Sequence, residues 1–380
     1  MSEPASPERA GAGAGRRVRK AASKSPSQPA SMAAGKPSDK PKKKGLGVFG
    51  VMLATSIVLA LIAVGAVGGG YVWLTRAFEQ PGPAAEDKVV LLAPGLGLNA
   101  IAERLESEGL ITSRYVFRAG VTLEGGERSL KAGEYAVPAG ASMREIFAML
   151  ADGRVVQYAV TFAEGLTSAM IVASLAQSEV LEGEIAEAPP EGALLPETYQ
   201  VVRGTSRQAL LDRMAEAQTA LVDRLWETRA EGLPFDTKEQ AIILASIVEK
   251  ETGLPEERAR VAAVFVNRLK RGMPLESDPT IIYGISQGEP LVNAAGERRG
   301  IRRSELDNAA NPYNTYHIRG LTPGPICNPG ADSIAAVLNP ATTNDLFFVA
   351  DGTGGHAFAA TLAEHNRNVA RWRRIEREGQ

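Results

Sequence analysis

Two glutamates near the end of one predicted helix are the residues best suited to acid–base chemistry. The segment Asp236-Thr-Lys-Glu239 predicts the start of this helix, with its first residue as N-cap, and Gly253 predicts its end. Glu251 follows Leu244 by seven positions, so the helical period places it on the same apolar stripe. Glu249 lies about 200° away around the helix. The two carboxylates therefore cannot face one cleft from a regular helix.

Glu251 has a physical reason to hold its proton near neutral pH. Desolvation on an apolar face disfavours the carboxylate anion, and the negative end of the helix dipole acts in the same direction. A carboxylic acid that stays protonated near neutral pH can serve as a general acid. The alternative is that Glu251 is an exposed residue at the helix end, close to Lys250 or Arg258.

Ser246 and Lys250 on the same helix offer a second kind of chemistry. Their i, i+4 spacing could make a Ser–Lys dyad of an exported serine protease. Nucleophiles of this kind usually sit at exposed turns or helix starts, whereas Ser246 lies inside an apolar helix. The sequence therefore disfavours the protease.

Metal and thiol chemistry have little support in the sequence. The three histidines are scattered along the chain, and no HExxH pattern relates them, so we expect structural hydrogen-bonding roles for His317, His356 and His365. Cys327 is the single cysteine, which excludes an internal disulfide and a cysteine-rich zinc site. We expect neither a metal nor another cofactor.

The charge of the chain is divided unevenly along its length. The 380 residues have a net charge of −2, but residues 1–44 carry 11 Lys/Arg against 3 Asp/Glu. Residues 45–75 carry no charge, and residues 77–380 are net acidic. This pattern argues against a simple cytosolic enzyme, and the length allows two or three domains.

The apolar run from Val48 to Leu74 predicts a membrane-spanning helix. It is long enough to cross about 30 Å of hydrocarbon with some tilt, and Tyr71 and Trp73 suit the membrane interface. A cleaved signal peptide, the alternative, has a shorter apolar core. Positive flanks stay cytoplasmic, so the basic residues before the run predict a cytoplasmic N-terminus. The basic cluster could also bind anionic lipid, and we expect no nucleic-acid partner.

The sequence predicts five segments. They are a disordered basic cytoplasmic tail at 1–44, a transmembrane helix at 45–75, a linker at 76–87, a small domain at 88–155 and a larger domain at 156–378. The small domain has a predicted β-α-α-β-α order, with a capping box at Ser142–Glu145. It contains no catalytic constellation and could be a carbohydrate-binding module or a spacer.

Several motifs, in order, resemble those of the endolytic murein transglycosylase (YceG-like) family. They are Ala245–Thr252, Val264–Leu269, Ser277–Thr280 with Tyr283–Gly284, Tyr313–Tyr316, Gly320–Pro325, Asn328–Asp332 and Phe347–Gly352. The resemblance covers about residues 46–375. Two departures are Leu194–Tyr199, where the family usually has Leu-Phe-Pro-Asp-Thr-Tyr, and Glu276, where Gln is common.

The resemblance implies an α+β fold class, with a single N-terminal transmembrane helix, a small LysM-like β-α-α-β subdomain and an α+β catalytic domain. It also implies a lytic transglycosylase, a lyase that cuts nascent peptidoglycan between MurNAc and GlcNAc, forms 1,6-anhydroMurNAc and terminates glycan elongation. The catalytic glutamate of the family falls on Glu251. Asp278, Asn314, Tyr316 and Glu249 are weaker candidates for contacts with the substrate.

The location implied is the bacterial inner membrane, with the chain passing once and the catalytic domain in the periplasm. The implied partners are peptidoglycan strands, the membrane and peptidoglycan synthases. Two other functions remain open at this point: a non-catalytic peptidoglycan-binding scaffold of the wall-synthesis machinery, and the Ser–Lys protease.

Overall fold

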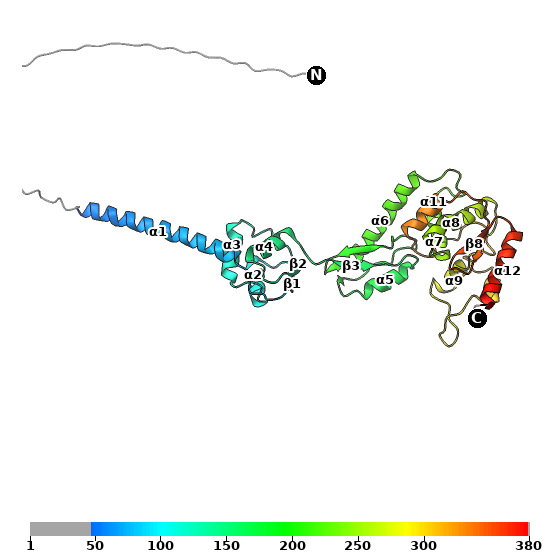
Figure 1. The fold of residues 1–380 in the computed structure, drawn as a ribbon, viewed down its shortest axis with the longest axis horizontal. Coiled ribbons are helices and arrows are strands. Elements are labelled where there is room, and N and C mark those ends of the chain that lie inside the picture. Colours follow the sequence, from blue (N-terminus) through cyan, green and yellow to red (C-terminus); the bar gives the residue numbers. More distant parts are fainter. Residues whose placement is uncertain (1–46, 379–380) are drawn as a thin grey trace, which may run out of the picture. The chain divides into compact units, whose positions relative to one another are not determined.

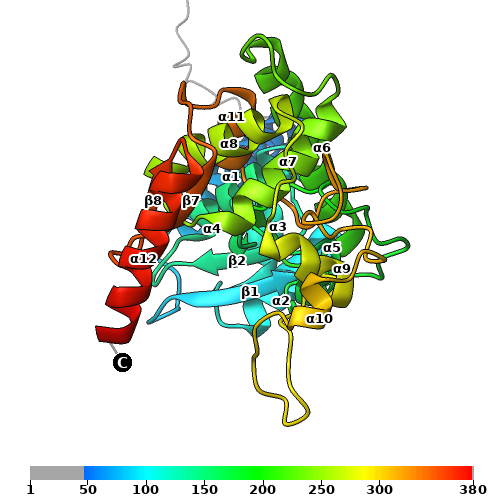
Figure 2. The same cartoon turned by 90° about the vertical axis from the view of Figure 1, so that its right-hand side faces the viewer.

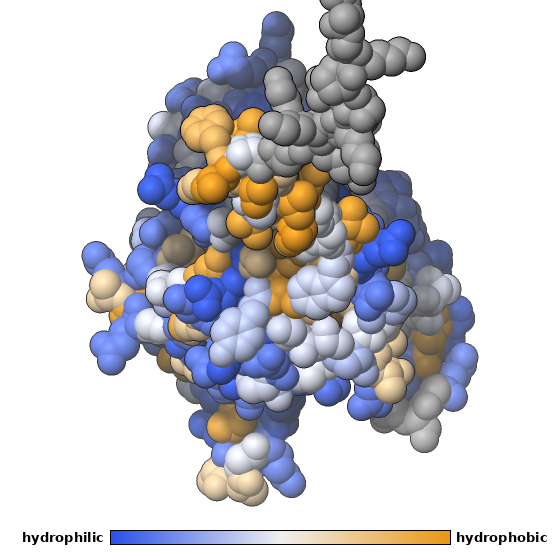
Figure 3. All heavy atoms as spheres, turned by 90° about the vertical axis from the view of Figure 1, so that its left-hand side faces the viewer, coloured by the Kyte–Doolittle hydropathy of each residue, from blue (hydrophilic) through white to orange (hydrophobic). Residues whose placement is uncertain are grey.

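The computed structural model describes residues 47–378, and the predicted basic tail at 1–44 lies outside the described residues. The first element is α1 (Val48–Glu79), a helix long and apolar enough to cross a membrane. Its apolar side chains are exposed along most of its length and appear as the orange surface in Figure 3. The predicted transmembrane segment is thus confirmed as a helix with the length and composition needed to cross a membrane. The helix continues to Glu79, beyond the boundary expected at Thr75.

The elements that follow α1 have the predicted β-α-α-β-α order (Figure 1). These elements are β1 (Lys88–Leu92), α2 (Leu98–Ser107), α3 (Arg114–Leu123), β2 (Gly133–Val137) and α4 (Met143–Asp152). The strands β1 and β2 pair antiparallel, with Lys88 opposite Val137. The Ser142–Glu145 capping box is present at the start of α4, as predicted.

The last turns of α1 belong to the hydrophobic core that these elements form. Phe78 is only 2% exposed and packs near Phe117 and Phe147. Gly120 in α3 makes room for this ring, because a Cβ there would lie 2.5 Å from a ring carbon of Phe78. This burial explains why the helix extends into residues that the composition predicts as linker.

The rest of the chain combines helices with short strand pairs, which confirms a mixed α and β fold (Figure 2). Its first elements are β3 (Tyr158–Thr161), α5 (Ser168–Ala176), β4 (Leu181–Glu182), β5 (Thr198–Val201), β6 (Thr205–Ser206) and α6 (Arg207–Glu227). Then come α7 (Lys238–Glu251), α8 (Pro255–Lys270), α9 (Asp278–Ser286), α10 (Arg303–Leu306) and α11 (Ala331–Leu338). The last elements are β7 (Phe347–Ala350), β8 (His356–Ala359) and α12 (Leu362–Glu378). β3 pairs antiparallel with β5, β4 parallel with β6, and β7 antiparallel with β8.

The helix α7 runs through the largest hydrophobic core of the described residues. Leu244, Ile247 and Val248 are fully buried there, together with apolar side chains of α8 and α11. Burial of the stripe on these residues fixes the rotation of α7 about its axis. The end of α7 is thereby held at a defined position, and Glu251 is its last residue.

The start of α7 differs by one residue from the prediction. The N-cap is Thr237 rather than Asp236. The side chain that completes the capping box is that of Gln240 rather than Glu239. The Thr237 hydroxyl accepts the Gln240 N–H at 3.3 Å, and the Gln240 side chain accepts the N–H groups of Thr237 and Asp236. The amide of Gln240 therefore satisfies two backbone donors, which explains the shift.

Candidate active site

Glu251 is held at the end of α7 by a hydroxyl from a distant loop. Ser277 Oγ donates a hydrogen bond to Glu251 Oε1 at 2.5 Å. Burial is the main cause that raises the pKa of Glu251 to about 7, and the negative charge of Asp278 acts in the same direction. The Ser277 hydrogen bond and the positive charges of His356 and Arg268 lower the pKa in part. Glu251 is therefore an acid that is substantially protonated at neutral pH, as the stripe argument predicts.

A buried network of hydroxyls positions Ser277. The backbone N–H of Ser277 donates to Thr315 Oγ1 at 2.9 Å, and Thr315 shares a second hydrogen bond with Thr280. Glu276 adopts a positive φ of 54°, and its N–H donates to the Thr315 carbonyl. This strained backbone turns the chain so that Ser277 faces Glu251. Ser277 and Thr315 fall within the motifs named above, but no local pattern in the sequence predicts their roles.

Arg268 ties the loop before Ser277 to β7. Its buried guanidinium donates to the carbonyl oxygens of Leu346 at 2.7 Å, Leu275 at 3.0 Å and Pro274 at 3.1 Å. It also bonds the carboxylate of Glu276 at 2.8 Å. The departure from glutamine at position 276 thus supplies a charged partner for Arg268.

Replacing Arg268 with methionine should lower the free energy of unfolding by about 2–4 kcal/mol, because buried carbonyl groups lose their donor. Thermal or urea unfolding of the full-length chain in detergent measures this. Arg271→Met is the control, because Arg271 is exposed, and it should change stability by less than about 0.5 kcal/mol. Equal stability of the two variants would contradict the structural role of Arg268.

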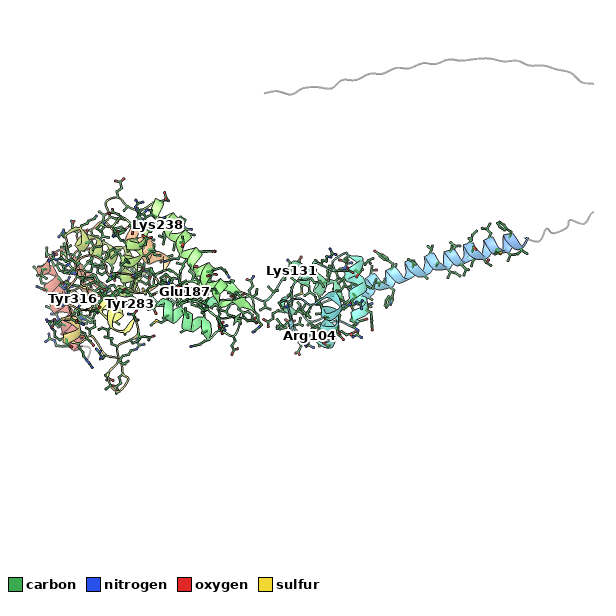
Figure 4. All side chains as sticks on the ribbon, turned by 180° about the vertical axis from the view of Figure 1, so that it is seen from behind. Arg104, Lys131, Glu187, Lys238, Tyr283 and Tyr316 are labelled. Carbon is green, nitrogen blue, oxygen red and sulfur yellow. The ribbon has the colours of Figure 1, made fainter. Side chains whose placement is uncertain are left out.

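Asp278 and Tyr316, two of the candidates for substrate contacts, lie close enough to Glu251 to interact with it electrostatically. Asp278 directly follows Ser277 and begins α9, and the Tyr316 hydroxyl donates to its Oδ1 at 2.8 Å. Burial of the hydroxyl and the nearby Asp278 raise the pKa of Tyr316 above its usual range, so it stays a donor. Both residues retain exposed surface, and Figure 4 labels Tyr316 among the C-terminal elements. They can therefore contact a molecule bound at Glu251.

Asn314 is buried and bonds to nearby backbone groups. Its side chain is fully buried, donates to the carbonyl oxygens of Leu306 and Asn308, and accepts the N–H of Tyr316 at 3.1 Å. All these bonds are within the loop that carries Tyr316. Asn314 thus shapes that loop, and its contact with a substrate stays a prediction.

Glu249 lies apart from the Glu251 network. Its Oε2 accepts the backbone N–H of Gly330 at 2.9 Å, which anchors the loop before α11. Lys250 and Arg258, which could have paired with an exposed Glu251, also have other partners. Lys250 donates to the Gly165 carbonyl, and Arg258 pairs with Asp332. The structure therefore separates the two glutamates as the helical period predicts.

Ser246 and Lys250 do not form a catalytic dyad. Ser246 is fully buried, and its hydroxyl donates to the Ile243 carbonyl at 2.7 Å and accepts the Ile326 N–H at 3.0 Å. Lys250 extends instead to the Gly165 carbonyl. The hydroxyl is thus occupied by backbone partners and closed to a substrate.

His356 lies near the site and contacts the carboxylate of Glu257. Its Nδ1 lies 2.6 Å from Glu257 Oε2, and its backbone N–H donates to the other oxygen of that carboxylate at 2.8 Å. The pair fixes the β7–β8 turn against the start of α8. His356 thus has a structural hydrogen bond, and its partner Glu257 is too distant in the sequence to be predicted from a local pattern.

Comparison with known proteins identifies the family. The model of the YceG-like family matches residues 90–371, which is more than half of the chain. This chain belongs to the YceG-like family. The match includes α7, α9 and the loop of Tyr316, so the whole network around Glu251 lies in the matched range.

Relatives of this YceG-like chain include named enzymes. Endolytic murein transglycosylases of two Streptococcus pneumoniae strains are 36% identical over 182 residues, which covers 47% of this chain and 32% of theirs. The chain thus spans about a third of their length. The endolytic murein transglycosylase of Bacillus subtilis is 28% identical over 335 residues, or 79% of this chain and 89% of that protein. A crystal structure of a yceG-like protein from Listeria monocytogenes is 26% identical, has a TM-score of 0.43, and covers 74% of this chain and 98% of that chain.

Proposed function

We propose that this protein is a membrane-anchored endolytic murein transglycosylase that cleaves MurNAc–GlcNAc bonds within peptidoglycan strands. The observation that carries the proposal is the largely buried acid Glu251, with a pKa raised to about 7, beside the exposed pair Asp278–Tyr316. The names of the relatives support the choice of substrate.

The chemistry needs one carboxyl group. Glu251 gives its proton to the glycosidic oxygen, and the bond from this oxygen to C1 of MurNAc breaks. The C6 hydroxyl of MurNAc then bonds to C1, and its proton returns to Glu251. No water is consumed, and the product ends in 1,6-anhydroMurNAc. Ordinary glycosidases use two carboxylates and water, whereas here the hydroxyl of the substrate replaces water.

The neighbours of Glu251 have supporting roles in this scheme. Ser277 orients the carboxyl group through its hydrogen bond. Asp278 can stabilise the positive charge that develops on the sugar ring, and Tyr316 holds the Asp278 carboxylate in place. The only reactive groups in this scheme are those of the protein and of the glycan.

The proposal places the protein in the bacterial inner membrane. In this arrangement α1 passes the membrane once, the N-terminus is cytoplasmic and the catalytic domain at 156–378 is periplasmic. The domain at 88–155 would act as a LysM-like unit, and the enzyme would terminate the strands that peptidoglycan synthases extend.

To test the proposal, the full-length chain in detergent is incubated with isolated glycan strands, and the lengths of the strands are measured over time. Internal cleavage should give fragments of intermediate length before short ones. Binding of strands without any cleavage would contradict the enzyme and favour a non-catalytic scaffold.

A further inference from the structure

A polar groove adjoins the proposed catalytic centre. It has a volume of about 380 Å³ and is lined by Asp278, Ile301, Arg302, Arg303, Leu306 and Tyr316. Asp278 directly follows Ser277, whose hydroxyl bonds Glu251, so the groove begins one residue after the hydroxyl that holds the acid. A glycan strand bound at Glu251 would therefore place its neighbouring groups in this groove.

The arginines of the groove differ in their partners. Arg303 pairs with Asp307 at 2.7 Å, and the nearby Arg299 pairs with Glu305 through two bonds. Within residues 47–378, the Arg302 guanidinium has no carboxylate within ion-pair distance. Arg302 is exposed and follows the loop that projects beside α9 and α10 in Figure 2. It is thus available to a ligand.

The charge of the groove selects the part of the substrate that it can bind. This step rests on the proposed function. Sugar hydroxyls and acetamido groups are neutral, whereas the peptide attached to the lactyl group of MurNAc carries carboxylates. Guanidinium groups match carboxylates with two parallel hydrogen bonds. Asp278 would repel an anion, so the carboxylate belongs at the Arg302 end of the groove.

We propose that this groove is a subsite for the acidic stem peptide of peptidoglycan, with Arg302 binding a peptide carboxylate. Arg303 adds positive charge, although it is shared with Asp307. The subsite holds the MurNAc residue that bears the peptide in register with Glu251. The enzyme would then prefer strands with charged peptides over strands whose peptides are neutral.

The test compares strands that carry free peptide carboxylates with the same strands after these carboxylates have been converted to amides. Arg302→Gln in the full-length chain should lower kcat/KM about tenfold on the charged strands, mainly through KM. Amidation should cost the wild-type protein a similar factor. The combined change should cost no more than either alone, because both remove one interaction.

Controls separate this subsite from other roles of the residue. Arg302→Lys should recover part of the activity, and Arg298→Gln, an equal charge change on an exposed residue outside the groove, should stay within twofold of wild type. Equal losses for Arg302→Gln on both substrates, or no loss on either, would overturn the proposal.

A binding assay distinguishes failure of the subsite from failure of the proposed function. Charged and amidated strands are bound to the Glu251→Gln protein, with and without Arg302→Gln. A preference for charged strands that is lost with Arg302 supports the subsite, even if the wild-type protein cleaves nothing. Equal binding of both kinds of strand would overturn it.

Discussion

Glu251→Gln should lower the rate of glycan cleavage by about 10³-fold or more. Glutamine has nearly the same shape and can still accept the Ser277 hydrogen bond through its amide oxygen. It cannot give a proton to the glycosidic oxygen or take one from the C6 hydroxyl. General acid–base catalysis contributes about 10²–10⁴-fold, and here one group performs both steps. The release of shortened strands by the purified protein measures the loss.

Glu249→Gln is the matched control on the same helix. Its amide oxygen can still accept the Gly330 N–H, so we expect a loss of only a few-fold. Both variants should bind strands and unfold like the wild-type protein. Strong loss of activity in Glu249→Gln, with Glu251→Gln active, would show that the residue assignment is wrong.

The cleavage rate should fall about tenfold for each pH unit above a pH of about 7. Glu251 must enter the reaction protonated, and its pKa is raised to about 7, so the competent fraction is lost as the pH rises through that value. At pH 9 the rate should be about 100-fold below its value at pH 6. The measurement is kcat/KM from pH 5 to pH 9, because this ratio follows the ionisation of the free enzyme.

Ser277→Ala provides the check on this assignment. The Ser277 hydroxyl lowers the pKa of Glu251, so its removal should move the alkaline fall of activity to higher pH. A rate that already falls near pH 4–5, the range of an ordinary carboxyl group, would contradict a buried general acid.

The sequence was sufficient to orient Glu251 because local periodicity determines which face of a helix a residue occupies. The stripe through Leu244 and Val248 is buried as expected, and Glu249 points to a different partner. The Ser277 hydroxyl could not be predicted in the same way, because it lies 26 residues further along the chain. Its approach to Glu251 depends on Arg268 and on the strained backbone at Glu276.

Two other differences have physical causes that composition does not reveal. Asn314 lies in a polar loop, and nothing in that segment shows whether its side chain faces outward or bonds the loop itself. The sequence predicts a linker from residue 76, but α1 continues to Glu79. The reason is that Phe78 is buried in a core with Phe117. The contacts of Asn314 are local, at most eight residues away, but they depend on the path that the loop takes. The contacts of Phe78 come from α3 and α4, which are separate from α1 in the sequence.

Cleavage in water enriched in ¹⁸O, followed by mass spectrometry of the new MurNAc ends, tests the central claim most directly. If Glu251 works alone and the C6 hydroxyl attacks C1, the new ends should be 1,6-anhydroMurNAc and should contain no ¹⁸O. Reducing MurNAc ends that carry ¹⁸O would show that water is the nucleophile and would contradict the account.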